Sequence, residues 1–273
     1  MDTFAPVALL NGLAADAEAN ALLALAWSNY GHFTTVRVRE GAVQGLGLHF
    51  DRLRQGNAEL FDAGLDEAVV RAWMRQASAA SGGDCSLRVT VFSRHFDHRH
   101  PVRELEVDVL VTASAPVSPA RPPMRVRSCA WLRLLPHLKH VGTFPLHHHR
   151  RQAILAGCDD VLFVDGDGAT ARVVEGSVWN VGFWDGEGVV WPRAPALRGT
   201  AERLLQEGLA RQGVAQQIRP VTMAELPALH AAFAVNANGR RDLAAIDEVV
   251  FGAAPELASI LDLAAAQAPW EPL

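Results

Sequence analysis

The stretch from KHVGTF at 139–144, through GCDDVLFVDGDG at 157–168, to EGSVWN at 175–180 determines the fold and chemistry expected of this chain. Its first segment holds the only lysine, Lys139, because 24 of the 25 basic residues are arginine. Arginine replaces a surface lysine at little cost, but a guanidinium stays protonated and cannot attack a carbonyl carbon. Lys139 is therefore a candidate for forming a Schiff base. The alternative is an ordinary surface lysine retained by chance, and the neighbouring sequence decides between them.

EGSVWN supplies a carboxylate, Glu175, where a predicted strand ends in a Gly-Ser turn. In a pyridoxal phosphate enzyme a lysine binds the cofactor covalently. A carboxylate beside the pyridine nitrogen keeps that nitrogen protonated, so that the ring accepts electrons. Lys139 and Glu175 are the two obvious candidates for these roles.

Composition limits the class of protein. The chain has 273 residues, 49% hydrophobic and 20% charged, which favours one large or two modest folded domains with a buried core. No apolar stretch approaches the ~20 residues of a membrane span, and the first residues lack the features of a signal peptide. Three scattered cysteines show neither disulfide nor zinc spacing, so the cytoplasm is the expected compartment.

The formal net charge is −5, which argues against nucleic acid as the main partner, since phosphate binding needs a clustered positive field. A small-molecule partner fits better, and no membrane partner is expected.

Hydrophobic periodicity and turn residues predict an α+β protein with mostly antiparallel strands. The Pro-rich segment at 113–123 is predicted to be a linker between two domains. Strands are expected at 7–10, 33–38, 43–48, 86–92, 104–112, 124–131, 160–164, 171–174, 178–184, 218–221 and 231–235. The expected helices are 14–26, 49–63, 66–80, 145–156, 200–211 and 223–229.

With these motifs the chain resembles the class IV aminotransferases. These are the fold-type IV pyridoxal phosphate enzymes, such as branched-chain aminotransferase, D-amino-acid aminotransferase and 4-amino-4-deoxychorismate lyase. The resemblance runs from about residue 10 to residue 246 and rests on the order and separation of motifs that are mostly weak alone. The motifs are FTTVRV (33–38), HFDRL (49–53), the lysine loop, GCDDVLFVDGDG, EGSVWN, ALRGTAERLL (196–205) and VNANG (235–239).

The resemblance implies two domains, a smaller N-terminal α/β domain at 1–112 and a larger C-terminal domain at 124–273. The C-terminal domain is expected to be antiparallel and barrel-like and to carry the cofactor lysine. The implied cofactor is pyridoxal 5′-phosphate, placed between the domains. Lys139 takes the Schiff-base and proton-transfer roles, and Glu175 the contact to the pyridine nitrogen. Arg52 of HFDRL matches the arginine that binds the cofactor phosphate, a bidentate task suited to guanidinium.

Two further segments match parts of the family that face the same phosphate. Gly199 and Thr200 match a turn whose backbone N–H groups and hydroxyl hold the phosphate at a helix N-terminus. Asn236 and Ala237 match the final phosphate-facing loop. Many relatives have Ser or Thr in place of Ala237, so one hydroxyl contact and some cofactor affinity are expected to be missing.

Other departures concern the substrate. The acidic residue that follows the phenylalanine of FTTVRV in many transaminases is Thr34 here, and the tyrosine that often follows the lysine loop is Phe144. The hydrogen bond that this tyrosine usually makes to the cofactor is therefore expected to be replaced or absent. The Phe-Thr-Thr and Lys-His sequences look more like the aminodeoxychorismate lyases. The candidate substrate-contacting residues are Tyr30, Thr34, Thr35 and Arg240.

The predicted function is transfer of an amino group between an amino acid and a 2-oxo acid. A 4-amino-4-deoxychorismate lyase that releases pyruvate and 4-aminobenzoate is the alternative, with Thr34 or Thr35 assisting proton transfer. A non-catalytic binding protein that keeps the fold is the third possibility, motivated by the departures at Phe144 and Ala237. The resemblance also implies a homodimer, with substrate selected partly by loops of the neighbour, such as the His-rich loop at 95–100.

No metal site is predicted. His147, His148 and His149 are consecutive on an expected helix, so their side chains point about 100° apart and cannot all bind one metal. The tip at 165–168 lacks the remaining ligands of a calcium loop and is expected to be a hairpin turn. Arg240 is equally suited to binding a carboxylate and to forming ion pairs.

Overall fold

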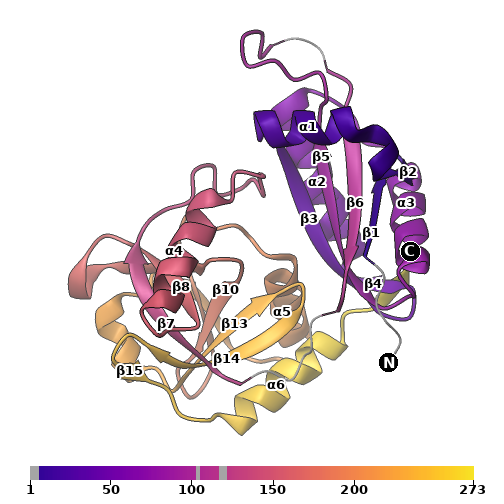
Figure 1. Cartoon of the computed structure of the whole chain (residues 1–273). Helices are drawn as coiled ribbons and strands as arrows, with labels where there is room; N and C mark the ends of the chain where they lie inside the picture. Colours follow the sequence, from indigo (N-terminus) through magenta and orange to yellow (C-terminus); the bar gives the residue numbers. More distant parts are fainter. Residues whose placement is uncertain (1–5, 103–104, 117–121) are drawn as a thin grey trace. The chain divides into compact units, whose positions relative to one another are not determined.

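The computed structural model describes residues 6–102, 105–116 and 122–273, which form two compact units (Figure 1). Unit 1 comprises Met1–Val117, Leu138–Gly142 and Trp270–Leu273, and unit 2 comprises Ser118–His137 and Thr143–Pro269. The predicted linker at 113–123 includes residues 117–121, which lie outside the described residues. The predicted domain limits stay predictions. Among the described helices, none is long and apolar enough to cross a membrane.

Unit 1 is built on an antiparallel sheet with strand order β2-β1-β6-β5-β3. Residues alternate between its two faces, and Figure 1 shows helices α2 and α3 on one face and α1 on the other. Residues such as Val36, Val89 and Val111 meet α2 and α3 in the main core. The elements are β1 (Val7–Leu10), β2 (Leu13–Ala14), η1 (Ala15–Glu18), α1 (Ala19–Ser28), β3 (Gly31–Val38), β4 (Ala42–Gln44), α2 (Leu46–Phe61), α3 (Glu67–Ala80), β5 (Cys85–Phe92), β6 (Asp108–Ser114) and β16 (Trp270–Pro272).

Unit 2 is a mixed sheet with strand order β12-β11-β10-β13-β14-β7-β8-β9, and β15 pairs with β14. The pairs β11·β12, β14·β7 and β7·β8 are parallel, and the others are antiparallel. The elements are β7 (Met124–Ala130), α4 (Phe144–Leu155), β8 (Asp160–Asp165), η2 (Gly168–Thr170), β9 (Arg172–Gly176), β10 (Asn180–Trp184), β11 (Val189–Pro192), α5 (Thr200–Arg211), β12 (Gln216–Arg219), η3 (Met223–Ala228), β13 (Ala231–Asn236), β14 (Gly239–Ile246), β15 (Val249–Val250) and α6 (Pro255–Ala266). The predicted α+β class is confirmed.

The strand predicted at 43–48 is wrong beyond Gln44. Gly45 takes a left-handed conformation, with φ of 65°, and helix α2 begins at the next residue. Strand β3 makes no hairpin with β4 beyond a single bridge between Arg39 and Ala42. It pairs with β5 along its whole length. The prediction also missed β11, β14, helix α6 and strand β16.

Helix α2 lies unusually close to strand β3 at Gly56. A Cβ atom on this glycine would lie 2.4 Å from Nδ1 of His32, whose ring is buried beneath the helix. The Nε2 of His32 hydrogen-bonds Oδ1 of Asn57, also on α2, at 2.7 Å. A glycine inside a helix costs stability by itself, so the close contact with His32 explains its presence.

We expect Gly56→Ala to lower the free energy of unfolding by up to about 2 kcal/mol. Overpacking against His32 costs about 1–3 kcal/mol, while alanine regains about 1 kcal/mol of helix propensity. At Gly47, on the same helix, no described residue comes within 4 Å of an added Cβ, so Gly47→Ala should stabilise the protein by up to about 1 kcal/mol. Denaturant unfolding measures both, and equal effects would contradict the close-packing explanation.

Candidate active site

The lysine segment of unit 1 is fixed to strand β3 by backbone hydrogen bonds. The N–H of Phe33 donates to the carbonyl of Lys139, and the N–H of Val141 donates to the carbonyl of Gly31, both at 2.9 Å. The Nζ of Lys139 lies 4.9 Å from the centre of the Phe33 ring. The amine is therefore presented on the side of β3 to which Phe33 points.

On the opposite side of β3, Thr34 links two residues of helix α2. Its Oγ1 lies 2.7 Å from Nδ1 of His49 and 3.5 Å from Nη1 of Arg52, which donates to it. Because the hydroxyl oxygen accepts from Arg52, its proton is available to the Nδ1 of a neutral His49. Burial, followed by the charges of Arg52 and Lys139, lowers the pKa of His49 to about 3. The charges of both Arg52 and Lys139 thus act on an uncharged imidazole.

Arg88 is a candidate site residue that the sequence did not reveal. Its guanidinium carbon lies 3.6 Å from the centre of the Phe33 ring, the same ring that Lys139 approaches. Burial lowers its pKa, and its Nε donates to Oγ1 of Thr90 at 3.3 Å. Among the described residues no carboxylate is paired with Arg88. The register that sets Arg88 opposite Thr35 on β3 places both on the Phe33 side of the sheet.

Glu175, at the end of β9 in unit 2, is one of the most buried carboxylates of the chain. Its Oε1 accepts from Nε of Arg133 at 2.9 Å, and both side chains are at most 4% exposed. The turn after it is fixed by Gly176, where a Cβ would lie 1.9 Å from the Trp179 ring. Ser177 donates to Asp160 at 2.6 Å. The guanidinium of Arg133 thus provides the buried carboxylate of Glu175 with an ion-pair partner.

Thr200 begins helix α5 and has a buried hydroxyl with no hydrogen-bond partner among the described residues. At the preceding Gly199 a Cβ would lie 2.0 Å from Oδ1 of Asn180, so only glycine fits. Asn180 in turn donates to the carbonyl of Leu197 at 2.7 Å. An unpartnered hydroxyl at the N-terminus of a twelve-residue helix suits an anionic ligand. These residues therefore fit the phosphate group of the implied cofactor.

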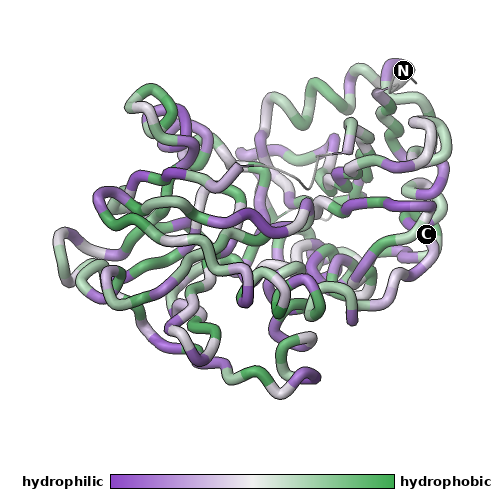
Figure 2. Tube along the Cα trace, turned by 90° about the horizontal axis from the view of Figure 1, so that it is seen from below, coloured by the Kyte–Doolittle hydropathy of each residue, from purple (hydrophilic) through white to green (hydrophobic). Residues whose placement is uncertain are grey.

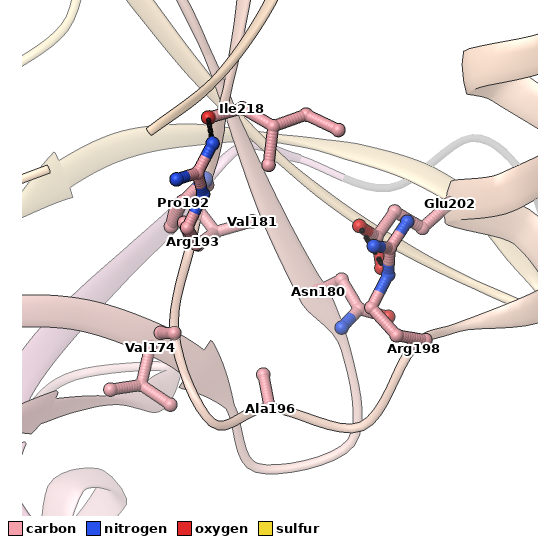
Figure 3. Close-up of a pocket in the computed structure, with 10 residues that line it drawn as sticks. Val174, Asn180, Val181, Pro192, Arg193, Ala196, Arg198, Glu202 and Ile218 are labelled. Atoms are coloured by element: carbon pink, nitrogen blue, oxygen red, sulfur yellow. Dashed lines mark hydrogen bonds and ion pairs between the residues drawn. The ribbon is translucent and has the colours of Figure 1, made fainter. Parts of the chain in front are cut away.

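A small pocket of about 80 Å³ lies beside this turn (Figure 3). It is lined by Asn180 and Val174, by the loop that precedes Gly199, and by Glu202 of α5. Glu202 accepts from the N–H of Gly199 at 3.2 Å and pairs with Arg198. Burial raises the pKa of Glu202. The carboxylate fixes the turn that leads into α5.

Asn236 ends β13, and Ala237 follows it in the turn that leads to β14. The side chain of Asn236 donates to the carbonyl of Val178 at 3.3 Å and accepts from the N–H of Asn238 at 2.9 Å. The amide side chain thus fixes the turn itself.

The remaining candidate residues are held by other contacts. The hydroxyl of Tyr30 donates to the carbonyl of Leu60 at 3.2 Å, and its ring stacks on Phe96 at 4.1 Å. Arg240 is paired with Asp242 and Asp262, both in unit 2. We therefore leave Tyr30 and Arg240 out of the proposed site.

Helix α4 follows the lysine segment. Phe144, its first residue, is 74% exposed. In the histidine run, His149 packs against Trp131 and lies 3.5 Å from the sulfur of Cys129. The described part of the chain holds no group of three or more side chains that could bind a metal ion.

The sequence of this chain matches the family described as amino-transferase class IV over residues 31–240. The chain belongs to the class IV aminotransferase family. This match confirms the family inferred from the order of the motifs, and the members of this family are enzymes. Comparison with curated proteins gives no match.

Solved structures of class IV aminotransferases share this fold. The branched-chain aminotransferase of Thermoproteus uzoniensis, solved with norvaline, is 19% identical with a TM-score of 0.82, over 95% of this chain and 94% of that one. A hypothetical aminotransferase of Mycobacterium tuberculosis in its PLP-bound form is 21% identical with a TM-score of 0.74, over 89% and 90%. A protein of Legionella pneumophila provisionally named 4-amino-4-deoxychorismate lyase is 21% identical with a TM-score of 0.75, over 88% and 91%.

The two buried histidines next to helix α2 predict how stability depends on pH. Burial lowers the pKa of His32 to about 4, and the pKa of His49 is about 3, against ~6.5 in an unfolded chain. Below pH 6.5 the unfolded state takes up protons that the folded state does not. The two neutral imidazoles therefore make their full contribution to stability above about pH 7. This contribution is lost as the pH falls towards about 4 for His32 and about 3 for His49.

We expect the free energy of unfolding to fall by about 1–2 kcal/mol per histidine between pH 7 and pH 5. Urea unfolding at the two pH values measures this difference. His49→Gln should reduce the difference, because it removes one titrating group. His→Gln at the exposed His98 should leave it unchanged. If His49→Gln leaves the pH dependence as it was, the buried imidazole is not its source.

Proposed function

We propose that this chain is a pyridoxal-phosphate-dependent aminotransferase that moves an amino group between an amino acid and a 2-oxo acid. The observation that carries the proposal is the setting of the only lysine. Its backbone is fixed to β3, and its charge, with that of Arg52, acts on the uncharged His49. The family match and the PLP-bound form of the Mycobacterium tuberculosis aminotransferase support pyridoxal 5′-phosphate as the cofactor.

Each proposed site residue has a role that suits its surroundings. Lys139 binds the cofactor carbonyl covalently and, once released, moves a proton to or from the substrate α-carbon. Arg52, Thr200 and the backbone N–H groups at the start of α5 bind the phosphate. Glu175, paired with Arg133, would accept a hydrogen bond from the ring nitrogen. When bound, the cofactor supplies an electron-accepting ring.

Asn236 and Ala237 are proposed to contact the phosphate through backbone groups only. Their turn lines the phosphate through backbone groups, because the Asn236 side chain is engaged within the turn. Ala237 offers no hydroxyl.

Arg88 is the proposed contact for a substrate carboxylate. A half-buried guanidinium that stacks on the aromatic ring next to Lys139 is well placed to bind an anion close to the reacting amine. Thr35 lies opposite Arg88 in the β3·β5 register and is the proposed neighbour of the same carboxylate.

A lyase acting on 4-amino-4-deoxychorismate is the second candidate. It is supported by the Phe-Thr-Thr and Lys-His sequences and by the fold shared with the Legionella pneumophila protein. The hydroxyl of Thr34 is engaged by His49 and Arg52, so Thr35 is the better candidate to assist proton transfer in such an enzyme.

The proposed compartment is the cytoplasm, supported by three free cysteines, Cys85, Cys129 and Cys158.

The cofactor assignment predicts that the protein takes up pyridoxal 5′-phosphate and turns yellow, because Lys139 is the only lysine available to bind it. Borohydride should remove the colour and leave the label on the peptide that contains Lys139, read by mass spectrometry. Lys139→Ala should bind the cofactor without a label. A protein that stays colourless with added cofactor would contradict the proposed function.

The cofactor-loaded enzyme, before any borohydride treatment, also separates the two reactions. An aminotransferase converts simple amino acids to 2-oxo acids and needs an acceptor to turn over again. A lyase releases pyruvate and 4-aminobenzoate from 4-amino-4-deoxychorismate with no acceptor present. A screen of amino donors read by cofactor absorbance would identify the substrate.

We also propose a homodimer. Helix α1 is hydrophobic along most of its length (Figure 2), yet Leu23 and Trp27, one turn apart, are 66% and 87% exposed. Such side chains favour burial against a second copy. Light scattering at micromolar concentration should report twice 29.5 kDa, and Trp27→Glu should shift the mass towards the monomer. A monomer with full activity would contradict the dimer.

A further inference from the structure

We propose that the last strand of the chain, β16, sets the position of the helix that carries Arg52, with Glu271 as a positioning residue. The inference rests on the proposed function, in which Arg52 binds the cofactor phosphate. Strand β16 lies outside residues 31–240, over which the family matches.

Helix α2 has no side-chain cap of its own at its N-terminus. Its N-cap residue is Gly45, and its first turn contains no acidic residue. The first N–H groups of a helix lack partners within the helix and lie at its positive end. The N–H of Leu46, the first residue of α2, donates to Oε1 of Glu271 at 3.1 Å. The carboxylate of β16 thus supplies the missing cap.

Glu271 is held in place by its whole strand. Trp270, Glu271 and Pro272 pair with Gln44, Val43 and Ala42 of β4, and the N–H of Leu273 donates to the carbonyl of Gly41 at 3.0 Å.

Side chains anchor the end of the same strand. The Nη1 of Arg75, on α3, donates to the carbonyl of Leu273 at 2.8 Å, and Arg71 donates to the carbonyl of Pro272. The side chain of Leu273 is 5% exposed and belongs to the same core as Leu46 and Phe50. Backbone, polar and apolar contacts therefore hold Glu271 at one place.

The capped turn leads directly to the proposed phosphate-binding residues. His49 is the fourth residue of α2, and its N–H donates to the carbonyl of Gly45 at 3.3 Å, so it lies within the turn that Glu271 caps. Arg52 follows one turn later on the same face of the helix. Its Nη1 donates to Oγ1 of Thr34 on β3 at 3.5 Å. A small displacement of the first turn would therefore change the position of Arg52.

The test compares the binding of two probes, pyridoxal 5′-phosphate and pyridoxal, to the full-length protein freed of cofactor. We expect Glu271→Ala to raise the Kd for pyridoxal 5′-phosphate about ten-fold and to leave the Kd for pyridoxal unchanged, because pyridoxal lacks the phosphate. Glu271→Gln keeps an acceptor oxygen and should restore most of the affinity. Glu271→Asp withdraws the carboxylate by one methylene and should give an intermediate value.

Asp66→Ala is the matched control. The side chain of Asp66 caps α3 by accepting from the N–H of Val69 at 3.1 Å, and α3 carries none of the proposed cofactor contacts. Both alanine variants should lower the melting temperature, by about 2–4 °C, because each loses one helix cap. Asp66→Ala should leave both dissociation constants unchanged.

The outcomes separate the two proposals. If the unaltered protein binds no pyridoxal 5′-phosphate, the proposed function fails and this inference fails with it. If it binds the cofactor but Glu271→Ala and Glu271→Asp bind equally well, only the positioning role is overturned. Equal weakening of both probes, or equal weakening by Asp66→Ala, would also overturn it, because the effect would then be general destabilisation. Should Glu271→Ala not fold, Glu271→Asp and Glu271→Gln decide the question.

Discussion

The pairing of the lysine segment with strand β3 is the constraint on which the rest of unit 1 depends. Two backbone hydrogen bonds, between Phe33 and Lys139 and between Val141 and Gly31, fix the lysine along one edge of β3, and β5 occupies the other edge. A strand held at both edges cannot rotate, so the alternation of its side chains has a fixed direction. Phe33 then points towards Lys139 and Arg88, while Thr34 points towards helix α2.

The charged side chains around the proposed site residues are arranged differently in the two units. In unit 1, the charges of Arg52 and Lys139 both act on His49, which burial keeps neutral. In unit 2, Glu175 is buried together with Arg133, which compensates its charge. Replacing a buried ion pair by packed apolar side chains is often neutral or stabilising. The pair is therefore better explained by the carboxylate that it holds in place than by the stability it adds.

Much of this arrangement could be predicted from sequence, because it depends on local signals. The helix at 200–211 follows a glycine, and the strand at 7–10 precedes an Asn-Gly turn. The strand predicted at 43–48 failed because apolar alternation continues through Gly45, where the backbone turns into a helix. Arg88 was missed because its place beside Phe33 depends on the register of β3 with β5, which no local pattern encodes. Strand β16 was missed because three residues, Trp-Glu-Pro, carry too little periodicity to signal a strand.

Helix α2 shows why such distant contacts matter to the site. His49, Arg52 and Gly56 recur at positions three and seven apart, so all three lie on the face that meets β3. Gly56 sets how closely that face approaches the strand, because its missing side chain lets the helix rest on the His32 ring. Glu271 fixes where the helix begins. Gly56 thus fixes the distance of the helix from β3 near one end, and Glu271 fixes the first residue of the helix at the other end. A side chain between these two points has little freedom to move. Arg52 lies between these two points. The position of its guanidinium relative to a phosphate therefore depends on contacts made one turn or more away along the helix.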